Sequence, residues 1–360
     1  MKKFTIRMLQ ISLLFFMMSL FLNLVVYPSL KIAPWTWGSD LLQFKREELL
    51  KNSKEYNTLI IGSSRVYRQV NPKLLDSVAD PSLQLKSYNM GVNWLFAPET
   101  FYVLDQLTNT DSLQFKFVVM ELSKIRSIDF ANFHTARIKY WYNWSNYIFT
   151  IKAVAASGFS IYEKVYTIFA HTVSYIDQLI NLGYLTETAK FKTDIVETGM
   201  ENANTGTDGF LPLSISEKSS KEENTMQRNR QFLSDTSVVT RRGEVSVTQF
   251  ERFEKNPELL KKYNRIYAEN LNNMIAESEK KGIFLVFLLS PRIDNNQYKE
   301  LLPLFNQIDP RHRIEISDGR KFPELYLAEN SFDGTHLNKV GADLYTTILA
   351  SRLSTLLKNR

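Results

Sequence analysis

The chain has 360 residues, of which 44% are hydrophobic and 23% charged, a composition typical of a globular protein with one large domain or two ordinary ones. It contains no cysteine, which excludes disulfides, thiol catalysis and cysteine-ligated metals. The net charge of +6 is spread along the sequence and not concentrated in one segment, and this argues against a nucleic-acid partner.

The N-terminal segment predicts a membrane anchor. Residues 8–27 form an apolar run with few polar interruptions, and their length suits a helix that crosses a bilayer. Lys2, Lys3 and Arg7 precede this run, so the positive-inside rule places the N-terminus in the cytoplasm and the rest of the chain outside the membrane. A cleaved signal peptide is the alternative, but it would prefer a shorter apolar core and a small-x-small cleavage site. We therefore predict an uncleaved single-pass anchor over residues 1–30, in the cell membrane.

The segment after the anchor predicts α/β structure. A connector with one helix, over 41–52, leads to short β-branched apolar runs that are typical of buried strands. Strands that alternate with helices indicate parallel βαβ units. We expect strands at 57–61, 85–91 and 115–122, and a helix at 98–107.

The pattern changes over residues 130–245. Residues 130–185 are rich in aromatic side chains, and isolated charges among them argue against a second membrane crossing. They predict an inserted helical region with an aromatic core, or alternatively a surface that touches the bilayer or a membrane partner. Residues 190–245 are polar and predict a long loop. The α/β domain, over residues 31–360, is thus expected to be interrupted at 130–245.

The α/β pattern then resumes. The run Ile283 to Leu289 is uniformly apolar and predicts a strand buried on both faces. The second part of the chain predicts helices at 257–281, 298–307 and 342–357, and strands at 283–289 and 313–317. The five strands together indicate one doubly wound parallel sheet with helices on both faces.

Three polar clusters fall at the carboxyl ends of the predicted strands, where such sheets have their active crevice. They are Gly62-Ser63-Ser64, residues 89–93, and Asp333 to His336. A serine at a strand-to-helix turn lies beside free backbone N–H groups, a histidine can take its hydroxyl proton, and an aspartate can orient that histidine. Each residue also has a structural alternative, since Ser is a common helix cap and Asp forms turns. Together they predict a triad of Ser64, His336 and Asp333.

The other three histidines, His134, His171 and His312, lack the spacing to carboxylates that a metal site requires. We interpret them as structural or surface residues and predict no metal site. Arg65, directly after Ser64, is expected to pair with a carboxylate, with binding of an anionic substrate as the alternative.

The two end clusters resemble those of the SGNH/GDSL hydrolase superfamily. Gly62-Ser63-Ser64 follows a strand, and Asp333-Gly334-Thr335-His336 precedes the last helix. The resemblance implies a flavodoxin-like sheet, Ser64 as nucleophile, His336 as base and Asp333 as the acid that orients it. The anchor and the insertion are similar to those of membrane-anchored SGNH-like proteins that accompany membrane-bound O-acyltransferases in modifying envelope polysaccharides.

Two further blocks of that superfamily supply oxyanion donors. The second block corresponds to residues 91–93, so the resemblance implies Gly91 and Asn93 as donors. In the third block this chain has Glu121 near the place where the superfamily has Gly-x-Asn. The match is therefore incomplete, and an oxyanion contact from an Asn side chain is missing there.

The resemblance implies an extracytoplasmic serine acyl-ester hydrolase or O-acyltransferase that acts on O-acetyl groups of a cell-envelope polysaccharide and needs no cofactor. Hydrolysis and transfer both stay open, because they differ in the acceptor and not in the triad. The alternative is a non-catalytic accessory protein that docks on a membrane-bound O-acyltransferase through residues 130–185.

Overall fold

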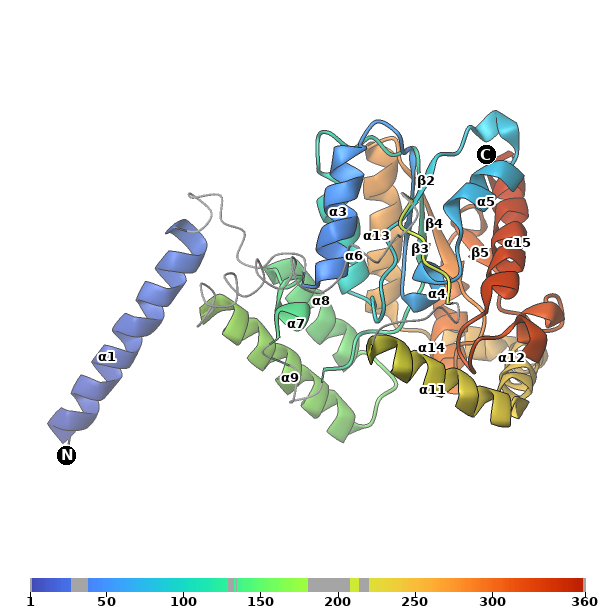
Figure 1. Cartoon of the computed structure of the whole chain (residues 1–360). Helices are drawn as coiled ribbons and strands as arrows, with labels where there is room; N and C mark the ends of the chain where they lie inside the picture. The colour runs from blue at the N-terminus through green and yellow to red at the C-terminus, as the bar shows by residue number, and fades with distance from the viewer. Residues whose placement is uncertain are drawn as a thin grey trace. The chain divides into compact units, whose positions relative to one another are not determined.

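The computed structural model describes residues 2–26, 38–128, 133, 135–180, 208–213 and 220–358, and it shows an α/β protein with a five-stranded sheet (Figure 1). All neighbouring strands run parallel, in the order β2-β1-β3-β4-β5. The sheet therefore agrees with the predicted strand number and direction. The strands are β1 (Thr58–Ile61), β2 (Ser87–Asn89), β3 (Phe117–Glu121), β4 (Phe284–Leu289) and β5 (Arg313–Glu315).

Helices cover both faces of the sheet (Figure 1). One face packs against α5 (Pro72–Val78) and α15 (Lys339–Lys358), and the other against α6 (Glu99–Thr108) and α13 (Arg265–Lys280). Successive strand side chains point to opposite faces, so a strand covered on both sides needs apolar residues throughout. β4 satisfies this requirement, since all six of its residues are buried.

The chain divides into two compact units, residues 1–44 with 127–202 and residues 45–126 with 203–360. The second unit contains the sheet. Its further elements are α4 (Ser64–Tyr67), α11 (Ser220–Ser234), α12 (Ser237–Lys255), α14 (Asn295–Phe305) and the 3₁₀ turns Pro81–Leu83, Pro257–Lys261, Pro310–His312, Pro323–Tyr326 and Ala328–Asn330. α3 (Asp40–Lys51) begins in the first unit and ends in the second.

The predicted loop over 190–245 is wrong for residues 220–234 and 237–245, which belong to α11 and α12. The many Ser, Thr and Val residues lower the intrinsic helix propensity of this stretch. α12 nevertheless buries Val239, Ser246, Gln249 and Phe253, at spacings of one helix face, so tertiary packing outweighs the propensity. Residues 190–207 and 214–219 of the predicted loop lie outside the described residues.

The first unit is helical in its described part. It contains α1 (Lys2–Phe21), the π-helical turn Leu22–Val26, α7 (Ala136–Lys139), α8 (Trp144–Ala155) and α9 (Ile161–Ile180). α8 and α9 pack against each other through aromatic rings, with Tyr147 and Tyr175 stacked at a centroid distance of 4.3 Å. Trp141 is fully buried beside them. The helices with aromatic contacts that the sequence indicates for 130–185 are thus present over residues 136–180.

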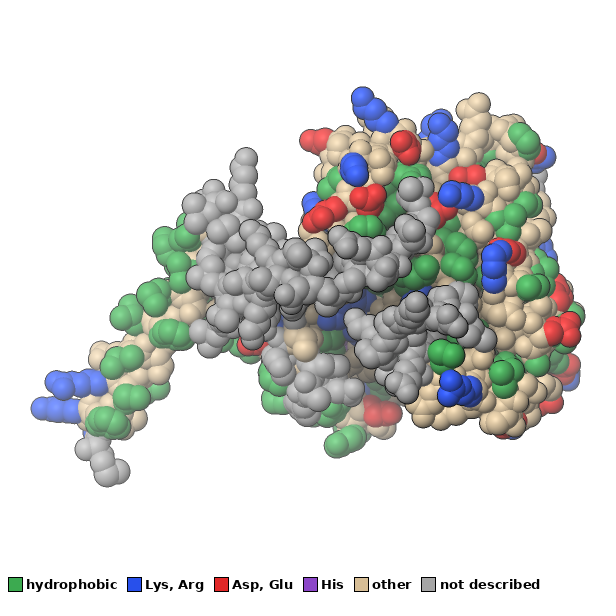
Figure 2. All heavy atoms as spheres, viewed as in Figure 1, with side chains coloured by type: hydrophobic (Ala, Val, Ile, Leu, Met, Phe, Trp, Pro, Cys, Tyr) green, Lys and Arg blue, Asp and Glu red, His purple; other side chains and the backbone are tan. Residues whose placement is uncertain are grey.

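α1 is long and apolar enough to cross a membrane, by length and composition, although a signal sequence has the same features. Its apolar side chains are exposed along the helix, and basic side chains cluster at its N-terminal end (Figure 2). The predicted apolar run ends at Tyr27, which lies outside the described residues.

Candidate active site

The turn after β1 places Ser64 at the carboxyl edge of the sheet. β1 ends at Ile61, and α4 begins at Ser64. A Cβ atom on Gly62 would overlap Val66 Cγ2 and would lie 2.7 Å from Glu121 Cβ, so a larger residue does not fit at this position. The Ser63 hydroxyl accepts a hydrogen bond from the Arg65 N–H at 3.3 Å and caps the short helix.

Glu121, at the end of β3, holds this turn from the adjacent strand. Its carboxylate accepts the Ser63 backbone N–H at 2.6 Å and the Arg65 side-chain N–H at 2.8 Å. The Glu121 side chain is only 1% exposed. The predicted pairing of Arg65 with a carboxylate is therefore confirmed. Glu121, near the place of the expected oxyanion asparagine, therefore acts as an acceptor that orients the turn carrying Ser64.

The structure brings the three predicted triad residues together, although 272 residues separate Ser64 from His336 in sequence. The Ser64 hydroxyl lies 2.8 Å from His336 Nε2. On the other side of the ring, Nδ1 lies 3.0 Å from both carboxylate oxygens of Asp333. Because a carboxylate can only accept, this arrangement puts the imidazole proton on Nδ1 and leaves Nε2 to accept the serine hydroxyl.

Asp333 is held as an anion. Burial alone would raise its pKa, but the hydrogen bond and charge of His336, and the bonds from Thr335, together place the pKa of Asp333 well below its usual range. One carboxylate oxygen accepts the backbone N–H groups of Thr335 and His336, each at 2.8 Å, and the Thr335 hydroxyl at 2.8 Å. A second charge contact comes from Arg228 on α11, with Nη1 at 3.6 Å from an Asp333 oxygen. The acid therefore stays ionised at neutral pH and favours the productive tautomer of His336.

Arg292 supports the Asp333–His336 turn from inside the protein. It follows β4, is fully buried, and has a left-handed backbone with φ at 61°. Its guanidinium donates to the backbone carbonyls of His336 at 3.0 Å and Leu325 at 2.7 Å, and to the Ser331 hydroxyl at 2.7 Å. Burial lowers the pKa of Arg292 to about 10, so the side chain remains charged at neutral pH.

The contacts of Arg228 and Arg292 with the Asp333–His336 turn were not predicted from the sequence. A signal for Arg292 was its position, because a charged residue three positions after the end of a uniformly apolar strand falls at the carboxyl edge of the sheet. α11 supplies Arg228, and also Asn229, whose side-chain amide donates to the Phe332 carbonyl at 2.7 Å. The signal for α11 was Ser220 followed three residues later by Glu223, the spacing of a helix capping box.

The two predicted oxyanion donors lie on the loop that follows β2. The Gly91 backbone N–H donates to the Asn89 side chain at 2.9 Å. The Gly91 N–H thus has an internal acceptor in this structure, and its role as an oxyanion donor stays a prediction. Asn93 is exposed in the turn that follows β2, and its role stays a prediction.

The remaining histidines have separate places in the molecule. His171 is buried, and its Nδ1 lies 2.7 Å from the Tyr142 hydroxyl. His312 is buried, and its Nδ1 lies 2.7 Å from the Leu285 carbonyl. His134 lies outside the described residues. Across the part of the chain that the structure describes, no group of three His, Asp or Glu residues is arranged to hold a metal ion.

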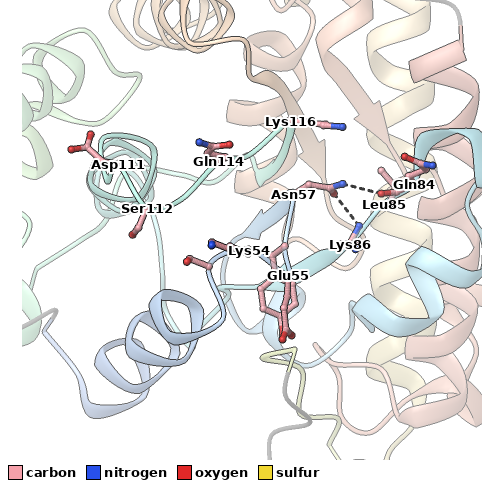
Figure 3. A pocket seen from close by; sticks show the side chains of 12 residues that line it. Lys54, Glu55, Asn57, Gln84, Leu85, Lys86, Asp111, Ser112, Gln114 and Lys116 are labelled. Carbon is pink, nitrogen blue, oxygen red and sulfur yellow. Dashed lines mark hydrogen bonds between the residues drawn. The ribbon is translucent and has the colours of Figure 1, made fainter.

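A cavity of about 860 Å³ lies at the opposite edge of the sheet, before the first residues of β1, β2 and β3 (Figure 3). Asn57 spans part of it, with hydrogen bonds to the Gln84 carbonyl at 2.8 Å and the Lys86 N–H at 2.9 Å. None of the triad residues lines this cavity. Because ligands of open parallel sheets bind outside the carboxyl ends of the strands, we place the candidate site at the triad.

Comparisons of the chain with protein-family models, with curated proteins and with solved structures each found no match.

Proposed function

We propose that this chain is a serine acyl-ester hydrolase or O-acyltransferase. The observation that carries the proposal is the continuous contact from Ser64 through His336 to Asp333, at 2.8 Å and 3.0 Å. The Ser64 and His336 side chains are partly exposed, so an ester can reach them. A serine, a base within hydrogen-bond reach and an acid that orients the base are the parts that nucleophilic acyl chemistry requires.

The chemistry proceeds in two stages. Ser64 Oγ attacks the acyl carbonyl carbon while its proton passes to His336 Nε2, and the tetrahedral intermediate then expels the alcohol, which takes that proton. The resulting acyl-enzyme is attacked by water in a hydrolase or by a glycan hydroxyl in a transferase. His336 accepts the proton of the incoming nucleophile and returns it to Ser64 as the acyl group leaves.

The Ser64 backbone N–H supports stabilisation of the oxyanion. It is the first N–H of α4, and it finds no acceptor among the described residues. The neighbouring Ser63 N–H is already donated to Glu121. We therefore assign the Ser64 N–H as one oxyanion donor, with Asn93 as the candidate for a second.

The fold and the anchor support the wider proposal. The strand order 2-1-3-4-5 is that of flavodoxin-like doubly wound sheets, which agrees with the resemblance to SGNH hydrolases. With α1 in a cell membrane as a single-pass anchor, the positive-inside rule places the catalytic domain on the extracytoplasmic side. The substrate class we propose is an O-acetylated cell-envelope polysaccharide.

The test is covalent labelling of the purified full chain with a fluorophosphonate probe. The probe requires an activated serine, so we expect labelling of the wild type and its loss in Ser64→Ala and His336→Asn. Ser63→Ala is the matched control, since it removes the adjacent hydroxyl, which caps α4, and leaves the triad in place. Labelling that survives in Ser64→Ala, or that disappears in folded Ser63→Ala, would contradict the proposed nucleophile.

A second function is favoured by one observation on the first unit. α9 exposes Ile161, Val165, Phe169 and Ile176, which recur at the spacing of one helix face. This apolar face supports the alternative of an accessory protein that docks on a membrane-bound O-acyltransferase. Envelope acetylation in cells that carry Ser64→Ala separates the two functions, because a docking protein retains its effect and an enzyme loses it.

A further inference from the structure

Trp94 is the feature of the candidate site that the acyl chemistry leaves unexplained. Its side chain is 70% exposed, although most tryptophans bury the greater part of their surface. Its backbone has φ at 61°, a left-handed conformation that disfavours residues with a Cβ atom. An exposed aromatic side chain in an unfavourable backbone conformation indicates a functional role for the side chain.

A buried ion pair holds the Trp94 backbone in this conformation. Arg126 Nη1 donates to the Trp94 carbonyl at 2.7 Å and to Glu99 Oε2 at 2.5 Å. Glu99 is fully buried, and the Arg126 side chain is 10% exposed. A buried ion pair therefore fixes a turn whose tryptophan side chain is exposed to solvent.

This turn lies at the same sheet edge as the triad. The Val92 N–H donates to the Gly62 carbonyl at 3.0 Å. This bond joins the two loops, because Val92 lies two residues before Trp94 and Gly62 lies two residues before Ser64. A Cβ on Gly91 would lie 2.7 Å from the Tyr67 backbone nitrogen, so the same loop packs against α4. The chain path limits the distance between the Trp94 and Ser64 Cα atoms to about 20 Å, the length of a few sugar units.

We infer that Trp94 is a stacking platform for a sugar unit of the polysaccharide chain, within a few units of the one that carries the reacting ester. This inference rests on the proposed function. A pyranose ring presents a face of C–H groups that packs on the flat face of an indole, and the indole is large and rigid, so little entropy is lost on binding. Its neighbours also fit a glycan better than a bilayer. Asn93 is exposed and polar, and Leu95 is buried. Phe96 is partly buried and meets the indole edge to face at a centroid distance of 6.1 Å, so the apolar surface is confined to these two rings.

The experiment compares two substrates for the purified full chain: p-nitrophenyl acetate, and O-acetylated polysaccharide extracted from the envelope of the source organism. The measured quantity is the ratio of kcat/KM for the polysaccharide to kcat/KM for the small ester. We expect Trp94→Gly to lower this ratio about fivefold or more, mainly by raising the KM for polysaccharide. Glycine accepts the left-handed backbone, so this variant removes the indole and keeps the turn.

Two further variants complete the test. Trp94→Phe retains an aromatic face and is expected to recover most of the ratio. Trp144→Ala removes a tryptophan of similar exposure, 65%, from the other unit and is expected to leave the ratio at its wild-type value. A ratio that is unchanged in Trp94→Gly overturns the platform, as does an equal fall in Trp144→Ala.

The remaining outcomes distinguish this inference from the proposed function. Wild-type protein that cleaves the small ester but not the polysaccharide contradicts the glycan platform and leaves the triad chemistry intact. Wild-type protein that cleaves neither substrate and is not labelled by fluorophosphonate contradicts the proposed function itself. If Trp94→Gly weakens binding to anionic phospholipid vesicles while the ratio stays constant, Trp94 is a membrane contact and the platform is wrong.

Discussion

The carboxylate of Glu121 and the backbone N–H of Ser63 lie 2.6 Å apart, so the end of β3 orients the turn that carries the candidate nucleophile. The same carboxylate pairs with Arg65, directly after that nucleophile. Both donors are thereby satisfied by one buried side chain. Loss of one partner from such a buried pair costs more than the pair contributes, because the other charge is left uncompensated.

We therefore expect Glu121→Ala to destabilise the protein by about 3–5 kcal/mol and to lower kcat. Glu121→Gln keeps one acceptor oxygen and the same shape, so its cost should be smaller, about 1–3 kcal/mol. Urea unfolding followed by tryptophan fluorescence measures both. Glu258→Ala is the control, since Glu258 forms an exposed pair with Lys261 and its loss should change little. Equal unfolding curves for Glu121→Ala and Glu258→Ala would contradict this role.

Gly62 is expected to tolerate no side chain. An alanine Cβ at this position would overlap Val66 and would lie 2.7 Å from Glu121 Cβ, so the turn would have to shift. Overpacking of this kind costs about 1–3 kcal/mol, and the shift should also reduce fluorophosphonate labelling. Gly158→Ala is the matched control, because apart from its own residue and its two chain neighbours no heavy atom lies within 4 Å of the place that its Cβ would occupy. Thermal unfolding of the two variants tests the prediction, which fails if both melt at the wild-type temperature.

Arg292 is expected to act as a positioning residue for His336. Arg292→Met removes the donors to the 325–336 segment and should destabilise the protein by about 1–3 kcal/mol for each buried acceptor that is left unsatisfied. Arg292→Lys keeps the charge but lacks the planar fork that reaches several acceptors, so it should recover stability only in part. Arg265→Met, which breaks an exposed pair with Glu269, is the control.

The readout that separates positioning from simple destabilisation is kcat at a temperature well below unfolding. If Arg292 orients the histidine, folded Arg292→Lys should show a lower kcat with an almost unchanged KM for p-nitrophenyl acetate. A folded variant with wild-type kcat would show that Arg292 contributes to stability alone.

Whether a feature could be predicted from the sequence depends on how far apart in the sequence its contacting residues lie. The uniformly apolar run of β4 and the short runs of β1 and β3 indicate buried parallel strands, because covering both faces of a sheet leaves no polar alternative. The triad was also predictable, since two short motifs at the ends of an α/β pattern must meet at one sheet edge.

The supports of the site were not predictable in the same way. Glu121, Arg292 and Arg228 act through contacts between residues far apart in sequence, and the local signals at Arg292 and α11 do not show which residues they contact. The sequence also did not indicate that the Asn89 side chain accepts the Gly91 N–H. α12 was missed because its buried face includes Ser246 and Gln249, which hydrophobic periodicity does not register.

Glu300, on α14, is expected to make the stability of the protein depend on pH. Burial raises the pKa of Glu300 to about 7, and the nearby charge of Lys124 opposes the shift. In an unfolded chain this carboxyl titrates near about 4.3, so between about pH 4.3 and 7 the folded state binds more protons than the unfolded state. Stability linked to Glu300 is therefore present below about pH 4.3 and is lost as the pH rises through about 7.

Glu300→Gln removes this titration and keeps the shape of the side chain. Relative to the wild type, the variant should gain stability between pH 5 and pH 8, by up to about 3 kcal/mol, as measured by urea unfolding at a series of pH values. Glu277→Gln is the control, because hydrogen bonding to Lys280 lowers the pKa of Glu277 and its titration falls below this window. A difference between wild type and Glu300→Gln that stays constant from pH 5 to pH 8 would show that Glu300 is ionised in the folded protein throughout.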